Sequence, residues 1–190
     1  MNRKLITFLG FVYIPLSGWK RMNAIEPETF YFKDDGRIPN NRLPLLLYRS
    51  AFNGDVSVRK LKSYFKENDW TNSWENGIYD FHHYHSTSHE VLGVASGSAR
   101  LQLGGENGRQ VTVNAGDVIV IPAGVGHKKL EASDDFVVVG AYPEGRDWDL
   151  LKGEPGERPQ ADKNIAALPI PKMDPLFGNA SGLREIWKKA

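Results

Sequence analysis

Between residues 77 and 142 the sequence breaks into short apolar stretches, and turn signals interrupt it every few residues. The turns are rich in glycine, asparagine and aspartate, as in residues 104–108 and 133–135. Stretches this short favour β-strands, and several of them at close, even spacing predict an all-β sandwich or barrel. The predicted strands cover residues 78–85, 90–95, 99–103, 110–113, 117–121, 127–132 and 136–142.

Length and composition bound the fold and exclude several kinds of site. The chain has 190 residues, which favours one domain with extensions, and its 41% hydrophobic residues can fill a core. Lys and Arg number 24 against 23 Asp and Glu, so the net charge of +1 gives no reason to expect a nucleic-acid partner. The absence of cysteine excludes disulfides, thiolate zinc sites, iron–sulfur clusters and a cysteine nucleophile. Any metal must therefore be held by nitrogen and oxygen.

The sequence on either side of the strand-rich region divides into three further segments. Before it, apolar residues at helical spacing, among them Leu61 and Phe65, predict one amphipathic helix over residues 55–67. After it, the stretch 183–187 is apolar enough to dock on the barrel. We therefore divide the chain into a doubtful leader (1–21), an N-terminal extension (22–76), a core barrel (77–142) and a C-terminal tail (143–190). Short strands are expected in the extension at 29–32 and 43–48.

The leader has two interpretations. Arg3 and Lys4 precede an apolar run over residues 5–16, the shape of a signal peptide, but no small-residue cleavage site follows. The run is also shorter than the roughly 20 residues that a membrane-spanning helix needs. Met22 opens a sequence typical of a cytosolic start, which favours a start codon placed too early. We therefore expect a cytoplasmic protein without a membrane span, or an exported one if the leader is a true signal peptide.

The histidines are the residues that point to chemistry. Alternation along the predicted strand 78–85 places His83 and His85 on one face, close enough to share an ion. Glu90, on the next predicted strand, can reach the same point, and barrel closure can bring His127 opposite the pair. Three imidazoles and one carboxylate suit a divalent transition metal (Fe, Mn, Ni, Co or Zn) and leave positions open for a substrate.

The same histidines have more ordinary interpretations. A buried histidine can simply be a satisfied core residue, and Glu90 can orient an imidazole through a hydrogen bond rather than bind the ion. The same alternation sends His82 and His89 to the opposite face, where they are expected to lie at the surface or to pack against the sheet. A register slip of one residue would exchange these roles.

Four neighbouring side chains also have two interpretations each. Tyr79 and Phe81 share the face of the predicted ligands, and we expect them in the barrel core, with a pocket lining as the alternative. Lys128 and Lys129 are expected to be solvated lysines at a strand edge, with recognition of an anionic substrate as the alternative.

Two spaced motifs in this region resemble those of the cupin superfamily. The first is Gly77-(x5)-His83-x-His85-(x4)-Glu90-(x6)-Gly97, and the second is Gly116-(x5)-Pro122-x-Gly124-(x2)-His127. All nine fixed positions are present, 18 residues separate the motifs, and only the end of the second departs from the pattern, with Glu131 in place of the usual asparagine. The segment 82–97 and the tail at 174–187 are most similar to the uncharacterised YjlB-type cupins.

This resemblance implies an RmlC-like jelly roll, a double-stranded β-helix barrel in one domain. It implies a divalent metal held by His83, His85, Glu90 and His127. It also implies a metal-dependent enzyme of the dioxygenase or isomerase type on a small organic substrate, or alternatively a non-enzymatic cupin that binds a small molecule or sugar. Cupins commonly pair through exposed strands, so a homodimer is expected. Glu131 and Tyr79 are the candidates for a general base.

Overall fold

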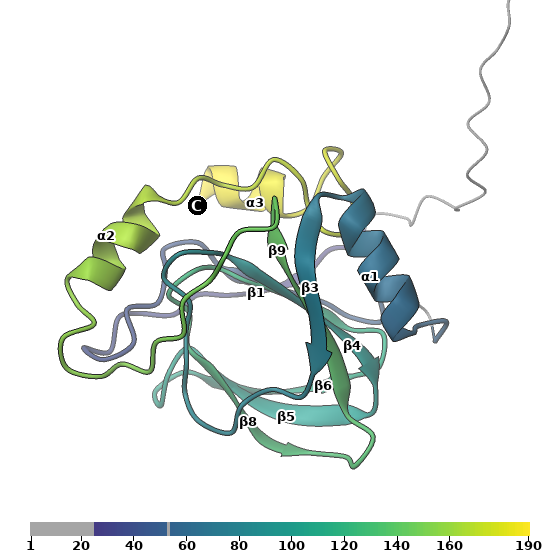
Figure 1. Ribbon diagram of the computed structural model, residues 1–190, viewed down its shortest axis with the longest axis horizontal. Helices are drawn as coiled ribbons and strands as arrows, with labels where there is room; N and C mark the ends of the chain where they lie inside the picture. The colour runs from purple at the N-terminus through teal and green to yellow at the C-terminus, as the bar shows by residue number, and fades with distance from the viewer. Residues whose placement is uncertain (1–24, 53) are drawn as a thin grey trace, which may run out of the picture.

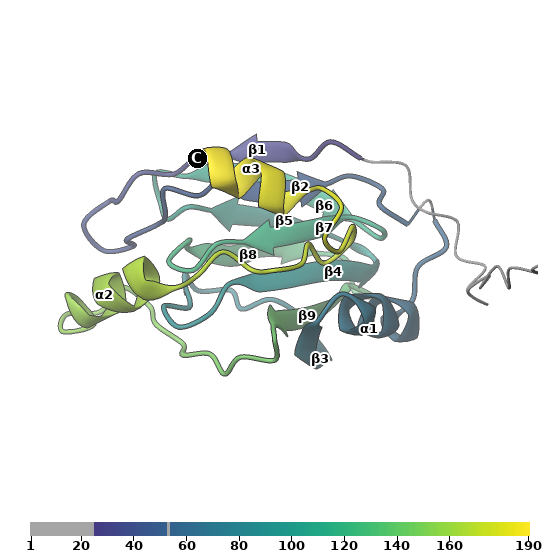
Figure 2. The same ribbon diagram turned by 90° about the horizontal axis from the view of Figure 1, so that it is seen from above.

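Two antiparallel β-sheets face each other and form the barrel (Figures 1 and 2). The structure is a computed structural model that describes residues 25–52 and 54–190, so the expectations for the leader lie outside the described residues. The larger sheet has the strand order β1-β2-β7-β4-β9-β3, and the smaller has the order β6-β5-β8. The strands are β1 (Glu28–Phe30), β2 (Leu45–Tyr48), β3 (Trp70–Asn76), β4 (Glu90–Ser96), β5 (Ser98–Leu103), β6 (Arg109–Asn114), β7 (Val118–Ile121), β8 (His127–Ala132) and β9 (Val137–Pro143).

This topology confirms the predicted fold class, an all-β jelly roll. The six strands β4 to β9 coincide with the stretches predicted from residue 90 onwards, to within a residue or two at each end. Three strands of the larger sheet, β1 to β3, come from the segment 22–76. The N-terminal extension therefore takes part in the barrel's larger sheet.

The strand predicted at 78–85 is wrong, and a regular strand lies just before it, at β3. Residues 77–85 form only isolated bridges, His83 with His127 and Tyr84 with Leu151, so their backbone pairs with two different segments. No strand was predicted at β3, because a register shift between Thr71 and Trp74 interrupts the alternation of inward and outward side chains.

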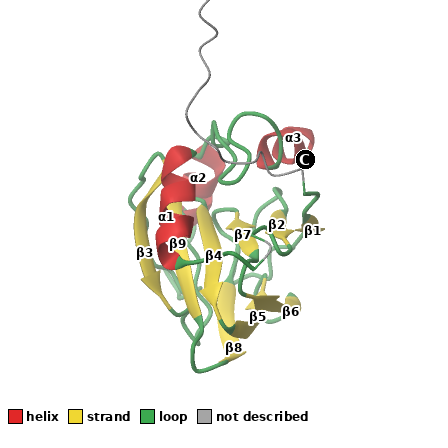
Figure 3. Ribbon diagram, turned by 90° about the vertical axis from the view of Figure 1, so that its right-hand side faces the viewer, coloured by secondary structure: helices red, strands yellow, loops and turns green. Residues whose placement is uncertain are grey.

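Three helices pack around this barrel in the part of the chain that the structure describes. The predicted helix is confirmed as α1 (Val58–Glu67), which the side chain of Ser57 caps, and it lies along the outside of the larger sheet (Figure 3). The helix α2 (Gln160–Ala167) was not expected, whereas α3 (Leu183–Lys189) lies in the tail segment that was expected to dock. None of the described helices is long and apolar enough to cross a membrane.

The larger sheet carries one apolar cluster on each face. Alternation along β4 sends Val91 to the cluster beneath the helices and Leu92 to the cluster between the sheets. Gly93, on the same face of β4 as Val91, lets α1 approach closely, since a Cβ there would lie 2.7 Å from Cδ2 of Leu61. The outer cluster also holds Trp187 of α3, which is fully buried and donates its indole N–H to the Pro44 carbonyl over 2.9 Å.

The docked tail gives a first testable prediction. We expect Trp187→Ala to lower the free energy of unfolding by about 4 kcal/mol, because it leaves a large cavity in the core. The matched control is Trp148→Ala, at a tryptophan that is 38% exposed. It should cost less than about 1 kcal/mol. Urea denaturation measures both, and equal losses would show that α3 does not dock as described.

Candidate metal centre

Three buried imidazoles meet at one end of the barrel. His83, His85 and His127 each offer one ligand atom, and these atoms all lie within 4.8 Å of one another. Reciprocal backbone hydrogen bonds join His83 and His127, with N···O distances of 3.2 and 2.9 Å, and place their ring centroids 4.0 Å apart. The bridge outside the regular strands therefore sets the geometry of this pair.

Backbone carbonyls fix the orientation of all three rings. Nδ1 of His83 lies 3.2 Å from the carbonyl of Phe81, and Nδ1 of His127 lies 3.2 Å from the carbonyl of Val125. Nδ1 of His85 contacts the carbonyl of Asp149. A carbonyl can only accept, so each Nδ1 carries the proton and each neutral ring keeps a lone pair on Nε2. Metal-binding histidines are commonly held in this way.

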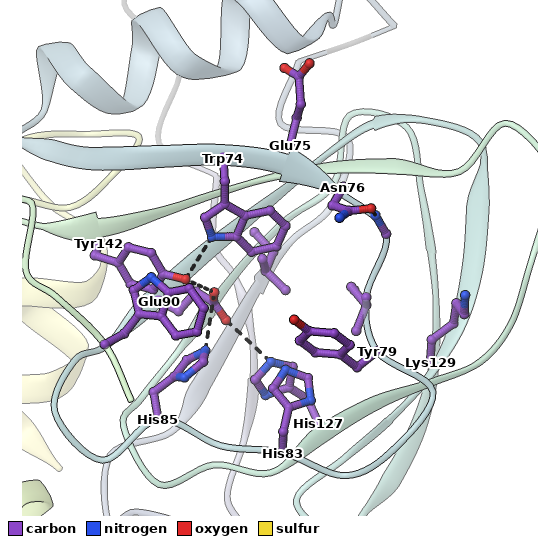
Figure 4. A pocket seen from close by; sticks show the side chains of 14 residues that line it. Trp74, Glu75, Asn76, Tyr79, His83, His85, Glu90, His127, Lys129 and Tyr142 are labelled. Atoms are coloured by element: carbon purple, nitrogen blue, oxygen red, sulfur yellow. Dashed lines mark hydrogen bonds and ion pairs between the residues drawn. The ribbon is translucent and has the colours of Figure 1, made fainter. Parts of the chain in front are cut away.

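Glu90, the first residue of β4, lies beside the three histidines. Its carboxylate oxygens lie 3.6 Å from Nε2 of His85 and 3.4 Å from Nε2 of His127 (Figure 4). Tyr142 donates its hydroxyl to Oε1 over 2.9 Å, and the indole of Trp74 donates to that hydroxyl over 2.8 Å. Oε2 is buried and accepts no hydrogen bond from the described residues. Tyr142 thus holds the oxygen that lies against His85, and the oxygen that lies against His127 keeps its lone pairs free.

The protonation of the cluster suits a cation. Burial lowers the pKa of His83 to about 2, and the neighbouring His127 adds to this shift. Burial would also lower the pKa of His85, but the Glu90 carboxylate outweighs it and raises that pKa. For Glu90, burial would raise the pKa, yet His85 and His127 lower it below its usual range. An ionised Glu90 beside an uncharged His83 is the state that binds a transition metal, so these donors fit one.

Asp149 supports the loop that carries His85. Besides its carbonyl contact with His85, its carboxylate accepts the backbone N–H groups of Ser86 and Thr87 over 2.6 and 3.2 Å. Burial would raise the pKa of Asp149, but these hydrogen bonds lower it. The same segment places the ring of Trp148 over His85, with 5.0 Å between ring centroids.

The cluster opens into a pocket of about 380 Å³ with aromatic walls. Its lining includes Trp74, Tyr79, His83, His85, Glu90, His127, Lys129, Tyr142 and Trp148. The expectation of a core position for Tyr79 and Phe81 is wrong, because Tyr79 is 49% exposed and lines the pocket. The half-buried Phe81 stacks against it, with ring centroids 4.8 Å apart.

Several other predicted residues lie outside the cluster. His82 lies near Glu106, and the buried His89 accepts the backbone N–H of Ala123 and packs against Trp187, so neither joins the three histidines. The proposed base Glu131 is excluded by its position, since it is exposed and paired with Arg100 over 2.8 Å.

Sequence reasoning missed three residues that support the site. Tyr142 ends a strand that was predicted, so inward alternation was the available signal for it. Trp74 lies in the N-terminal extension, before the predicted core barrel, where the sequence pointed to no site residue. Asp149 lies in an irregular segment with no periodicity, and nothing in the sequence linked it to His85.

Comparisons with known proteins agree with this geometry. Residues 75–139 match the protein family described as Cupin domain (Cupin_2). The chain is 44% identical over 165 residues to the uncharacterized protein YjlB of Bacillus subtilis (strain 168), and the alignment covers 86% of this chain and 98% of YjlB.

Solved structures give partial likenesses to the barrel. A Bacillus anthracis acireductone dioxygenase with a cadmium ion in its active center is 17% identical, with a TM-score of 0.35, over 47% of this chain and 60% of its own. A mutant of the Bacillus subtilis oxalate decarboxylase OxdC is 20% identical, with a TM-score of 0.35, over 67% of this chain and 30% of its own. Likenesses this partial carry no argument about activity.

The support from Asp149 gives a second testable prediction. Asp149→Asn should lower the free energy of unfolding at pH 7 by about 1–2 kcal/mol, because the amide cannot accept every hydrogen bond. Since the folded pKa lies below the unfolded value, the aspartate's contribution is present at neutral pH and fades as the pH falls through the folded pKa. Urea titrations at pH 7 and at low pH measure this, with exposed Asp147→Asn as the control. A deficit that persists unchanged at low pH would contradict it.

Proposed function

This chain belongs to the cupin superfamily and to the family of YjlB, and from that premise we propose that it is a metal-dependent enzyme acting on a small organic substrate. One divalent transition metal (Fe, Mn, Ni, Co or Zn) is held by His83, His85, His127 and Glu90. The reaction is of the dioxygenase or isomerase type.

One observation carries this proposal. Three buried imidazoles keep their Nδ1 atoms on backbone carbonyls, and each offers a ligand atom within 4.8 Å of the other two. Beside them, Oε2 of Glu90 lies 3.4 Å from Nε2 of His127 and accepts no hydrogen bond from the described residues. Lone pairs brought together in a buried site repel one another unless a cation lies between them. A core histidine with an ordinary packing role needs no such arrangement.

The chain's own residues prepare the site for a substrate. When bound, the metal supplies Lewis acidity and a template for two neighbouring oxygen ligands. Tyr142 and Trp74 hold Glu90 in place, and the pocket admits the substrate from the side that the aromatic residues line. Tyr79 is the remaining candidate for moving a proton, since its hydroxyl points into the pocket (Figure 4).

The alternative is a cupin that binds a small molecule or sugar without turnover. The aromatic walls would serve such a ligand equally well, and the metal would then hold the ligand. Turnover separates the two: oxygen uptake or isomerisation supports the enzyme, whereas a metal-loaded protein that binds small molecules without converting them supports the alternative. From the family resemblance we also propose a homodimer and a cytoplasmic location.

The metal itself is the third testable prediction. Untagged protein beginning at Met22 should contain about one transition-metal ion per chain by inductively coupled plasma mass spectrometry. His83→Ala and His127→Ala should each reduce this at least about tenfold. His82→Ala is the matched control, since His82 neighbours the ligands but lies outside the cluster. Wild-type metal content in the two ligand variants would refute the assignment.

The hydrogen bond to Glu90 gives the fourth. Tyr142→Phe removes the hydroxyl that holds Oε1, and we expect metal affinity to fall about tenfold. Tyr84→Phe is the control, because the Tyr84 hydroxyl bonds Glu157 rather than a residue of the cluster. Competition with a chelator of known affinity measures both variants. Equal affinities would show that Tyr142 does not position Glu90.

A further inference from the structure

One cation that lines the pocket, Lys129, has no counter-ion in the described part of the chain. The pocket's charged lining residues other than the histidines are Glu75, Glu90 and Lys129. Glu75 pairs with Lys62 over 2.7 Å and points away from the histidines (Figure 4), and Glu90 is held between His85 and His127. Lys129 has no ion pair or side-chain hydrogen bond within residues 25–52 and 54–190. Its positive charge is therefore available to a ligand.

The neighbouring lysine shows that this placement is specific. Lys128 and Lys129 are consecutive on β8, so their side chains leave opposite faces of the strand. Lys128 binds Glu106 over 2.7 Å, whereas Lys129 lines the pocket and donates its backbone N–H to the Tyr79 carbonyl over 2.8 Å. The expectation of a solvated strand-edge lysine does not fit Lys129.

The position of Lys129 gives the pocket a second polar end. In Figure 4 it lies on the far side of Tyr79 from Glu90, while the histidines lie at the near end. A ligand that reaches from one end to the other passes the aromatic ring of Tyr79. With a divalent metal and a single carboxylate at the near end, both ends of the pocket attract negative charge.

We propose that Lys129 binds a carboxylate of the substrate, which is therefore a small organic anion with a second oxygen group directed at His83, His85 and His127. The inference rests on the proposed function, because it places the metal at the near end. A charge-assisted hydrogen bond from the Lys129 ammonium favours a carboxylate over a neutral amide of the same shape. The pocket therefore selects anionic substrates.

Binding of simple dicarboxylates tests this proposal. Isothermal titration calorimetry on metal-loaded protein compares malonate, succinate and glutarate, whose lengths differ in steps, with the monoamide of the tightest binder. The tightest dicarboxylate should bind about tenfold more weakly to Lys129→Gln than to the wild type, and Lys129→Arg should keep most of the affinity. The monoamide should bind to the wild type more weakly than the dicarboxylate does, by a similar factor. The Lys129→Gln substitution should weaken binding of the monoamide little further. Lys128→Gln is the matched control and should leave every affinity unchanged.

The outcomes separate this inference from the proposed function. Metal content is measured in the same samples, and a wild type that takes up no metal overturns the proposed function together with this inference. A metal-loaded Lys129→Gln that binds the dicarboxylate as tightly as the wild type overturns the inference alone. So does equal binding of amide and dicarboxylate, an equal loss in Lys128→Gln, or a loaded wild type that binds none of the three dicarboxylates.

Discussion

The bridge between His83 and His127 is the contact on which the site depends. Residues 77–85 belong to neither sheet, and their two β-bridges are this one and the one between Tyr84 and Leu151. The two bridges hold a short, irregular segment across the end of the barrel. Because side chains alternate along it, His83 and His85 face the pocket while Tyr84 packs on the other side against Ile38 and Ala161.

Electrostatic repulsion within the cluster lowers the stability of the folded chain. Three imidazole lone pairs and a carboxylate share a buried site, where weak screening strengthens their repulsion. The Glu90 carboxylate offsets part of it, since it raises the pKa of His85 against the effect of burial. A local arrangement that works against stability is expected where function requires it. A metal that binds only the folded chain would raise the free energy of unfolding and so offset part of this repulsion.

The sequence pointed to strands β4 to β9 and to the four residues at the centre of the site, but not to β3 or to the residues that support the site. Strands β4 to β9 were recoverable because turn signals bound each short apolar stretch. The alternation of aromatic and histidine residues at 79–85 looked like a strand, although it reflects a pocket lining rather than sheet pairing. Asp149 could not be found, because a contact between an irregular tail and a loop 64 residues earlier leaves no periodic signal.

The choice of which β8 side chains face the pocket determines the charge of the pocket. His127 begins β8 with its side chain in the pocket, so alternation sends Lys128 outwards and returns Lys129 to the pocket. Once His127 is interpreted as a ligand that faces the pocket, the same alternation predicts that Lys129, two residues further on, faces it too. The chain's net charge of +1 gives no hint of this, because most of its charged residues lie outside the pocket. In a half-buried strand, the face of one known functional residue therefore predicts the faces of its neighbours. It predicts them better than the general tendency of lysines to be solvated does.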